Sequence, residues 1–291
     1  MIPMDLSIMS ALIVLAGLGL VFGAGLAIAS RAFAVHKDPR VAQIEAVLPG
    51  ANCGACGAPG CSGFAEGVVE GKYPVTGCTA GGAETSKAVA EIMGTEAGDV
   101  KACVAVVRCR GDKEACPDRA DYQGIRDCRA AMLVDDGSKG CVYGCLGLGT
   151  CVAACPFDAM VMGENGLPMV IEDKCTACGE CVRACPRDII ELVPRNQYVY
   201  IGCRSQDFGK AVKAVCKVGC IGCSLCANPK TTAEGLITMN GKLPEIHYDK
   251  VKDPWGDLEN AVKKCPTHSF GVRGGAPDSS AENNPAEDDS A

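Results

Sequence analysis

The chain has 291 residues and a formal net charge of −7, so its charge does not favour nucleic acid as a partner. Hydrophobic residues make up 48% and aromatic residues only 4%, which excludes a large aromatic-packed core. The 22 cysteines decide the class of protein. Disulfide scaffolds this rich in cysteine are short and secreted, whereas these cysteines fall in tight groups, several followed by proline. That pattern favours metal clusters and a reducing compartment.

The stretch from Leu6 to Ala29 is almost wholly apolar. At about 1.5 Å per residue it can span a hydrocarbon core roughly 30 Å thick. A cleaved signal peptide is the alternative, but the preceding residues Met1–Asp5 contain no Lys or Arg. We predict a retained single-pass membrane helix. Because Arg31, Lys37 and Arg40 all follow it, the positive-inside rule places the N-terminus outside and the rest of the chain on the cytoplasmic side.

The first soluble segment, residues 31–95, is predicted to be a small [4Fe–4S] domain. Helices are expected at Pro39–Leu48 and Ala83–Met93, with a glycine-rich loop between them. The glycines leave backbone N–H groups close to the metal, where hydrogen bonds to cluster sulfurs would raise the reduction potential. A zinc site with four cysteine ligands is the alternative. The candidate ligands are Cys53, Cys56, Cys61 and Cys78.

Residues 96–136 are interpreted as a connecting segment. Its cysteines follow no tight motif, so they are expected to be packing or free thiols, with a further cluster as the alternative. They are Cys103, Cys109, Cys116 and Cys128.

Residues 137–196 are predicted to form a two-cluster ferredoxin-like domain, with short strands at Met169–Ile171 and Ile189–Val193. In such motifs the cysteine before proline binds the other motif's cluster. A structural zinc site is the weaker alternative. One cluster is assigned to Cys141, Cys145, Cys151 and Cys185, and the other to Cys155, Cys175, Cys178 and Cys181.

Residues 197–272 contain a further ferredoxin-type loop, Cys220-x-x-Cys223-x-x-Cys226. Position 230, where a fourth ligand belongs, is Lys, so Cys265, which precedes Pro266, is the best candidate. Cys203 and Cys216 remain: they either contribute to another cluster or are plain buried thiols.

The predicted fold class is therefore α+β: a transmembrane anchor (1–30), a small cysteine-rich domain, and ferredoxin-like modules of the βαββαβ type. Residues 273–291 are acidic and poor in large apolar residues, which is typical of a disordered tail. The three histidines are isolated, and no catalytic array or dinucleotide fingerprint is found. An NAD site is not expected on this chain. At least three [4Fe–4S] clusters are expected, with a fourth at 220–265.

The combination of these motifs resembles one family, the B subunit of the Rnf complex, in its longer form. The resemblance covers about residues 1–272. One departure is Lys230-Thr231, where longer members tend to have Cys-Pro. The similar stretches are the apolar helix, the Cys53–Cys61 loop, Tyr122–Ala131, Cys141–Cys151 and Cys216–Cys223.

The resemblance implies an electron-transfer subunit of an ion-translocating ferredoxin:NAD oxidoreductase in the cell membrane. It would take electrons from soluble ferredoxin and pass them from cluster to cluster toward the other subunits, while the complex moves Na⁺ or H⁺. The residues alone predict only a membrane-anchored multi-cluster electron carrier. The alternatives are a stand-alone iron–sulfur enzyme and a zinc-ribbon adaptor.

Overall fold

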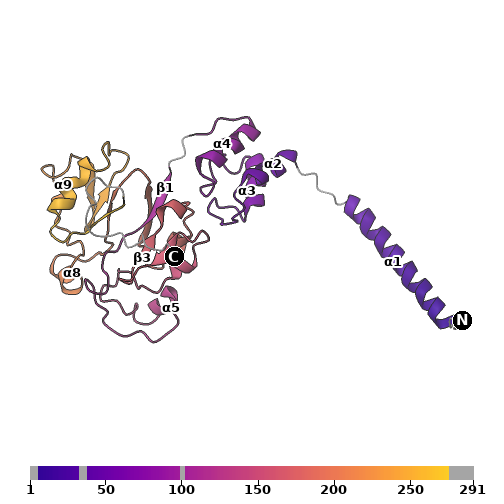
Figure 1. Ribbon diagram of the computed structural model, residues 1–291, viewed down its shortest axis with the longest axis horizontal. Helices are drawn as coiled ribbons and strands as arrows, with labels where there is room; N and C mark the ends of the chain where they lie inside the picture. Colours follow the sequence, from indigo (N-terminus) through magenta and orange to yellow (C-terminus); the bar gives the residue numbers. More distant parts are fainter. Residues whose placement is uncertain (1–5, 33–37, 99–101, 275–291) are drawn as a thin grey trace, which may run out of the picture.

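The computed structural model describes residues 6–32, 38–98 and 102–274. Figure 1 shows a long helix, a small helical unit and a larger part that contains all the labelled strands. The first five residues, Lys37, and all but the first two residues of the predicted tail lie outside the described residues.

The first helix, α1 (Leu6–Ala32), confirms the predicted apolar helix. Within it, Leu12–Arg31 has a mean hydropathy of 2.5 and none of that stretch is buried against the rest of the chain. Large apolar side chains such as Leu20 and Leu26 are more than 70% exposed. Among the described residues it is the one helix long and apolar enough to cross a membrane, although a signal sequence has the same properties.

The helical unit packs α2 (Pro39–Val47), α3 (Cys61–Val69) and α4 (Gly82–Met93) around one apolar core. Ile44, Phe64 and Val89 are buried completely or to within 1%. Asp38 caps α2 by accepting the Arg40 N–H at 2.8 Å, so the helix begins where its proline fits the first turn. The two predicted helices of this unit are confirmed.

The next part is a ferredoxin-like module in which the first strand pairs with the last. Cys103 lies opposite Pro194 in the antiparallel β1–β4 ladder, and β2 and β3 form a hairpin between these strands in sequence. The elements are β1 (Cys103–Val107), α5 (Cys128–Met132), α6 (Thr150–Ala153), β2 (Met160–Met162), β3 (Pro168–Val170), η1 (Glu172–Lys174), α7 (Glu180–Ala184) and β4 (Ile190–Pro194).

The structure corrects the interpretation of residues 96–136 as a connecting segment, because β1 is a strand of this module's sheet. The physical reason is the run of apolar, mostly β-branched residues Val104–Val107, all of which are buried. The predicted strands near 169–171 and 189–193 are confirmed as β3 and β4, each displaced by one residue.

The last part repeats the same strand pairing, with β5 against β8 and a β6–β7 hairpin. Its elements are β5 (Val199–Ile201), α8 (Lys210–Val215), η2 (Leu225–Ala227), β6 (Ile237–Asn240), β7 (Leu243–Ile246), α9 (Gly256–Lys264) and β8 (Phe270–Val272). We call residues 102–195 the first module and residues 197–274 the second module. Because both modules have the same strand pairing, the cysteine loops of the first module and those of the second lie in similar structural surroundings.

Arginine side chains join the two modules. Arg273 is 7% exposed, and its guanidinium forms an ion pair with Glu172 and donates to the carbonyl oxygens of Gln197 at 2.7 Å and Arg195 at 3.2 Å. Arg110 donates from its side chain to the Phe270 carbonyl at 2.6 Å. These contacts hold the end of the second module against the first.

Candidate iron–sulfur sites

Three cysteine loops share one backbone conformation. In each, the residues four and two positions before the last cysteine have a positive φ, which curls the backbone around a centre. The pairs are Gly147 and Gly149 before Cys151 (φ 70° and 78°), Ala177 and Gly179 before Cys181 (55° and 77°), and Gly222 and Ser224 before Cys226 (68° and 60°).

The three Cys-Pro turns are also alike. The residue three positions after each cysteine has a φ near 50°: Asp158, Asp188 and His268. The sulfurs of Cys155 and Cys265 each accept a backbone N–H from four residues on, both at 3.3 Å. Cys265-Pro266 therefore repeats the local geometry of the Cys-Pro turns in the first module.

Site I lies in the helical unit and gathers the four cysteines expected there around one hollow, with Phe64 behind them. Asn52, itself at φ 47°, accepts the Cys61 N–H at 2.8 Å through its side-chain oxygen and so fixes the start of α3. The sulfurs that line site I belong to Cys53, Cys56, Cys61 and Cys78.

Site II lies in the first module. As expected, it combines the three cysteines of the Cys175–Cys181 loop with Cys155, which precedes Pro156. Phe157, Met160 and Leu192 supply its apolar wall. Its cysteines are Cys155, Cys175, Cys178 and Cys181.

Site III differs from the expected grouping, because Cys128 lines it and Cys141 does not. Its cysteines are Cys128, Cys145, Cys151 and Cys185. The loop conformation shared with site II explains why a cysteine from outside the loop is needed in site III. Cys145 and Cys151 correspond to Cys175 and Cys181, and the place of the middle cysteine is occupied by Leu148.

Hydrogen bonds hold Cys128 in the position that this loop leaves open. Asp127 caps α5, and its carboxylate also accepts the Thr150 hydroxyl at 3.1 Å. The Thr150 oxygen accepts the Cys128 N–H at 2.7 Å, so Cys128 lies beside Cys151. The signal for this residue in the sequence is weak, because Cys128 lies 17 positions before Cys145.

Site IV lies in the second module and gathers Cys220, Cys223, Cys226 and Cys265, as expected. Lys230 occupies the position where the first module has Cys155. The second module also has no loop corresponding to Cys175–Cys181 before α9. The absence of a cysteine at position 230 therefore goes together with the absence of a second cysteine loop, and site IV still has four cysteines.

A fifth hollow lies between the two modules, and we call it the interface hollow. It is lined by Cys109, Cys116, Cys141, Cys203 and Cys216. The sequence indicated no definite cluster for Cys109, Cys116, Cys203 and Cys216. The structure brings these four cysteines together with Cys141 around one hollow. Cys103, on β1, lines none of the five hollows.

Burial is the main influence on the pKa of four cysteine thiols in sites II, III and IV. It raises the pKa of Cys145, Cys181 and Cys220 to about 12, and that of Cys151 to about 11, with neighbouring thiols adding to each rise. Grouped thiols at such pKa values hold their protons at neutral pH unless a cation compensates the thiolate charge. The sites are therefore suited to bind iron with release of protons.

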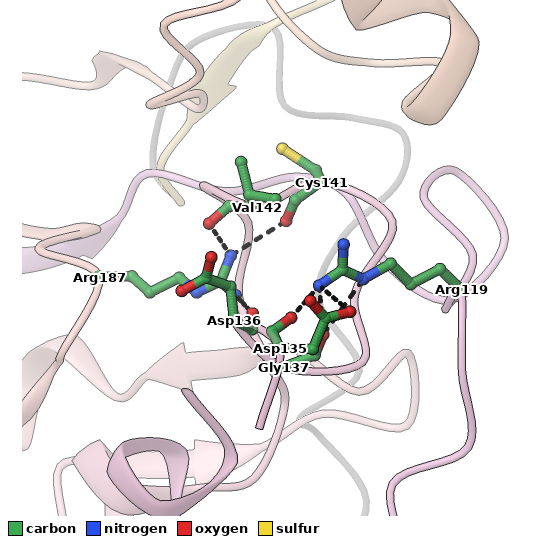
Figure 2. Close-up of polar contacts among 7 residues, drawn as sticks. All are labelled: Arg119, Asp135, Asp136, Gly137, Cys141, Val142 and Arg187. Carbon is green, nitrogen blue, oxygen red and sulfur yellow. Dashed lines mark hydrogen bonds and ion pairs between the residues drawn. The ribbon is translucent and has the colours of Figure 1, made fainter. Parts of the chain in front are cut away.

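Arg187 supplies a test of whether a cluster fits site III. Its side chain lines the hollow, and among the described residues its buried Nε has no hydrogen-bond partner. Figure 2 shows that its other nitrogens donate to the carbonyl oxygens of Cys141 (3.0 Å), Val142 and Asp136. A cluster sulfur could accept from the Nε, so the residues present fit the group.

Arg119 holds the same segment from the other side. Figure 2 shows its guanidinium against Asp135 and Gly137, with an ion pair to the Asp135 carboxylate at 3.3 Å. The two arginines thus fix the turn that leads from α5 to Cys141.

A site for a single metal ion is a separate case from a site for an iron–sulfur cluster. Within residues 6–32, 38–98 and 102–274, no three His, Cys, Asp or Glu side chains are arranged to share one ion.

The repeated loops, the Cys-Pro turns and the cysteine-lined hollows define an iron–sulfur electron-transfer protein. Comparison with known protein families agrees with this class. Residues 48–80 match the family described as "Putative Fe-S cluster", and residues 141–190 match the "4Fe-4S dicluster domain".

Three relatives extend the similarity over most of the chain. The B subunit of the Na(+)-translocating ferredoxin:NAD(+) oxidoreductase complex of Acetobacterium woodii is 48% identical over 85% of this chain and 73% of its own length. The B subunit of the ion-translocating oxidoreductase complex of Methanosarcina acetivorans is 44% identical over 84% and 91%. The B subunit of the proton-translocating ferredoxin:NAD(+) oxidoreductase complex of Clostridium ljungdahlii is 44% identical over 72% and 74%. The chain belongs to the B-subunit family of the Rnf complexes, as an iron–sulfur electron-transfer subunit.

Proposed function

We propose that this chain carries [4Fe–4S] clusters in sites I, II, III and IV and relays single electrons through them. The observation that carries the proposal is the repeated curl of the three cysteine loops, two of which are completed by one cysteine from elsewhere in the chain and the third, at site III, by two. Each cluster would be held by the four cysteines that line its site. When bound, the clusters supply the one-electron redox chemistry, and the chain's residues fix their spacing and surroundings.

Sites I, II and III lie next to one another. Arg183, at the end of the site II loop, donates to the Cys53 carbonyl in site I at 3.3 Å. Cys151 of site III and Cys181 of site II belong to the same buried core. Since electron tunnelling falls steeply with distance, this arrangement supports transfer between successive sites.

Charge supports an entry for electrons at site IV. Residues 197–274 contain 11 Lys and Arg against 7 Asp and Glu, whereas residues 38–98 contain 3 against 7. Cys223 of site IV is exposed. A module with net positive charge and an exposed cluster cysteine suits an acidic electron carrier, and the donor we propose is reduced ferredoxin.

Electrons would leave from site I, whose unit directly follows the anchor helix in sequence, toward the other subunits in the membrane. We place the two modules on the cytoplasmic side. The NAD site belongs to another subunit, and the complex couples the transfer to movement of Na⁺ or H⁺, making this chain a subunit of a translocase.

The decisive experiment measures metals in the purified protein and records low-temperature EPR spectra after dithionite reduction. We expect iron and sulfide in equal amounts, and at least about 16 iron atoms per chain for four clusters. Cys175→Ala removes the site II cluster and abolishes ferredoxin-driven NAD reduction by the complex. Zinc in place of iron would favour a zinc-ribbon adaptor instead. A cluster with an open coordination position that turns over substrate alone would favour a stand-alone enzyme.

A further inference from the structure

The interface hollow contains two pairs of cysteines that occupy equivalent positions in the two modules. Cys109 lies two residues after the end of β1, and Cys203 lies two residues after the end of β5. Each of these strands pairs with the last strand of its module. Cys109 and Cys203 are therefore counterparts.

Backbone hydrogen bonds support this equivalence. The N–H of Arg108 donates to the Ile189 carbonyl at 2.6 Å, and the N–H of Gly202 donates to the Ser269 carbonyl at 2.8 Å. The two donors directly precede Cys109 and Cys203, and the two acceptors each lie four residues after a Cys-Pro cysteine. The same local fold thus delivers one thiol from each module to the hollow.

The second pair precedes the cysteine loops. Cys141 lies four residues before Cys145, and Cys216 lies four residues before Cys220. Both are 9% exposed and both line the interface hollow, although the loops that follow them line sites III and IV. Since the loops correspond, these two thiols are counterparts as well.

Two glycines lie close to these thiols. A Cβ added at Gly111 would lie 2.9 Å from the Cys116 Cβ, 3.3 Å from the Cys216 sulfur and 3.8 Å from the Cys109 sulfur, so a side chain there would crowd the hollow. A Cβ at Gly219 would lie 2.5 Å from a Val212 methyl group and 3.5 Å from the Cys216 sulfur. Backbone N–H groups also point at two of the sulfurs: Cys145 donates to Cys109 at 3.3 Å, and Ser205 donates to Cys203 at 3.4 Å. Such hydrogen bonds are typical of cluster ligands.

A buried cation beside the hollow indicates that it receives negative charge. Lys139 is 5% exposed, and its ammonium donates to the Asp112 carbonyl at 3.0 Å. Among the residues the structure describes, no ion pair with a carboxylate is found for it. A buried ammonium without a carboxylate needs another anionic partner, and the Lys139 side chain lies next to the hollow, 3.6 Å from a Cβ position at Gly144 in its lining.

We propose that Cys109, Cys141, Cys203 and Cys216 hold a further [4Fe–4S] cluster, shared by the two modules and lying between sites III and IV. Residues next to one another in sequence line the neighbouring hollows: Gly144 and Cys145 on one side, and Gly219 and Cys220 on the other. One electron at a time passes through this position, and no bond forms or breaks. The role as a link rests on the function proposed above, whereas the site itself does not.

Cys116 is not among the four ligands. It has no counterpart in the second module, since the position seven residues after Cys203 is Lys210. Its side chain is completely buried against Cys141 and Cys216, in contact with two ligands of the cluster. It is therefore a neighbouring thiol that packs against two of the ligands.

The test is iron and acid-labile sulfide per chain in the full-length protein purified anaerobically in detergent. We expect about 20 iron atoms, against about 16 if only sites I to IV are filled. Cys141→Ala combined with Cys203→Ala takes one ligand from each module and leaves three thiols in the hollow. This variant should lose about four iron atoms and four sulfides and keep the EPR signals of the other clusters.

A matched control removes two other thiols, Cys103→Ala with Cys116→Ala, and should retain about 20 iron atoms. Unchanged iron in the ligand variant, or an equal loss in the control, would overturn the proposal. If the ligand variant does not fold, the count in the unaltered chain decides, and about 16 iron atoms there would overturn it too. An unaltered chain with no iron would instead contradict the proposed function as a whole.

Discussion

The guanidinium of Arg187 donates a hydrogen bond to the carbonyl oxygen of Cys141 at 3.0 Å. Arg187 lies two residues after Cys185, a cysteine of site III, while Cys141 lines the interface hollow. One side chain therefore links the walls of two neighbouring sites.

Replacing Arg187 by Met should destabilise the segment before Cys141 and lower the reduction potential of the site III cluster. The variant loses hydrogen bonds from a charged donor to three carbonyl oxygens, at a cost of about 2–3 kcal/mol. It also removes a positive charge that favours the reduced, more negative cluster. Anaerobic unfolding and an EPR-monitored redox titration measure the two effects. Arg187→Lys is the control: it should keep most of the potential but not the stability. An unchanged potential in the Met variant would contradict a cluster in site III.

The role of Cys128 can be tested by moving its thiol. Cys128→Ala should remove about four iron atoms, because the loop from Cys145 to Cys151 contains only two cysteines. Adding Leu148→Cys to that variant restores the middle cysteine of the loop, and we expect it to recover the lost iron and the corresponding EPR signal. Leu148→Cys in the unaltered chain serves as the control. If Cys128→Ala keeps all its iron, then Cys128 is not a ligand.

Reversing charge near site IV should slow electron input from ferredoxin. Lys230 and Lys242 are exposed, and the Lys242 carbonyl lies 3.1 Å from a Cβ position at Gly222 of site IV. Lys230→Glu with Lys242→Glu should lower the second-order rate of reduction by roughly tenfold at low salt, with a smaller effect at high salt. Stopped-flow reduction measures this rate. Lys87→Glu, at an exposed position on α4, should leave the rate unchanged, and an equal effect of both variants would exclude entry at site IV.

Arg273→Met should weaken the junction of the two modules. Its partner Glu172 is about a third exposed, so we expect a loss of about 2–3 kcal/mol rather than the larger cost of breaking a fully buried pair. Denaturant unfolding under anaerobic conditions measures it. Glu172→Gln keeps a hydrogen-bond acceptor for the arginine and should cost less. A Met variant as stable as the unaltered chain would show that this ion pair does not hold the modules together.

Short-range sequence patterns were sufficient to predict part of the fold. The helices at Pro39–Val47 and Gly82–Met93 follow from local periodicity and capping, and the strands β3 and β4 follow from short apolar runs. The strand β1 contains a similar apolar run, Val104–Val107, but that run alone does not indicate which sheet it joins, because its partner lies more than 80 residues away, at Ile190–Pro194.

The same distinction applies to the cysteines. The groupings at sites I, II and IV were visible in spacing and in Cys-Pro pairs. The place of Cys128 and the interface hollow depend on three-dimensional pairing: the first on a hydrogen bond to Thr150, 22 residues further on, and the second on two modules meeting. The sequence groups Cys141 with Cys145 because the two lie close together in the chain, whereas in the structure they line different hollows.

The pairing of β1 with β4 also constrains how the protein is made. The sheet of the first module cannot close until residue 194 has left the ribosome, and Cys185 is needed at a site whose other cysteines were synthesised long before. Contacts this distant in sequence form late and leave reactive groups accessible meanwhile. During synthesis, the thiols between Cys109 and Cys181 are therefore exposed to oxygen and to competing metals. Site III can be filled with iron only after Cys185 has been synthesised, so cluster assembly at that site follows synthesis of nearly the whole first module.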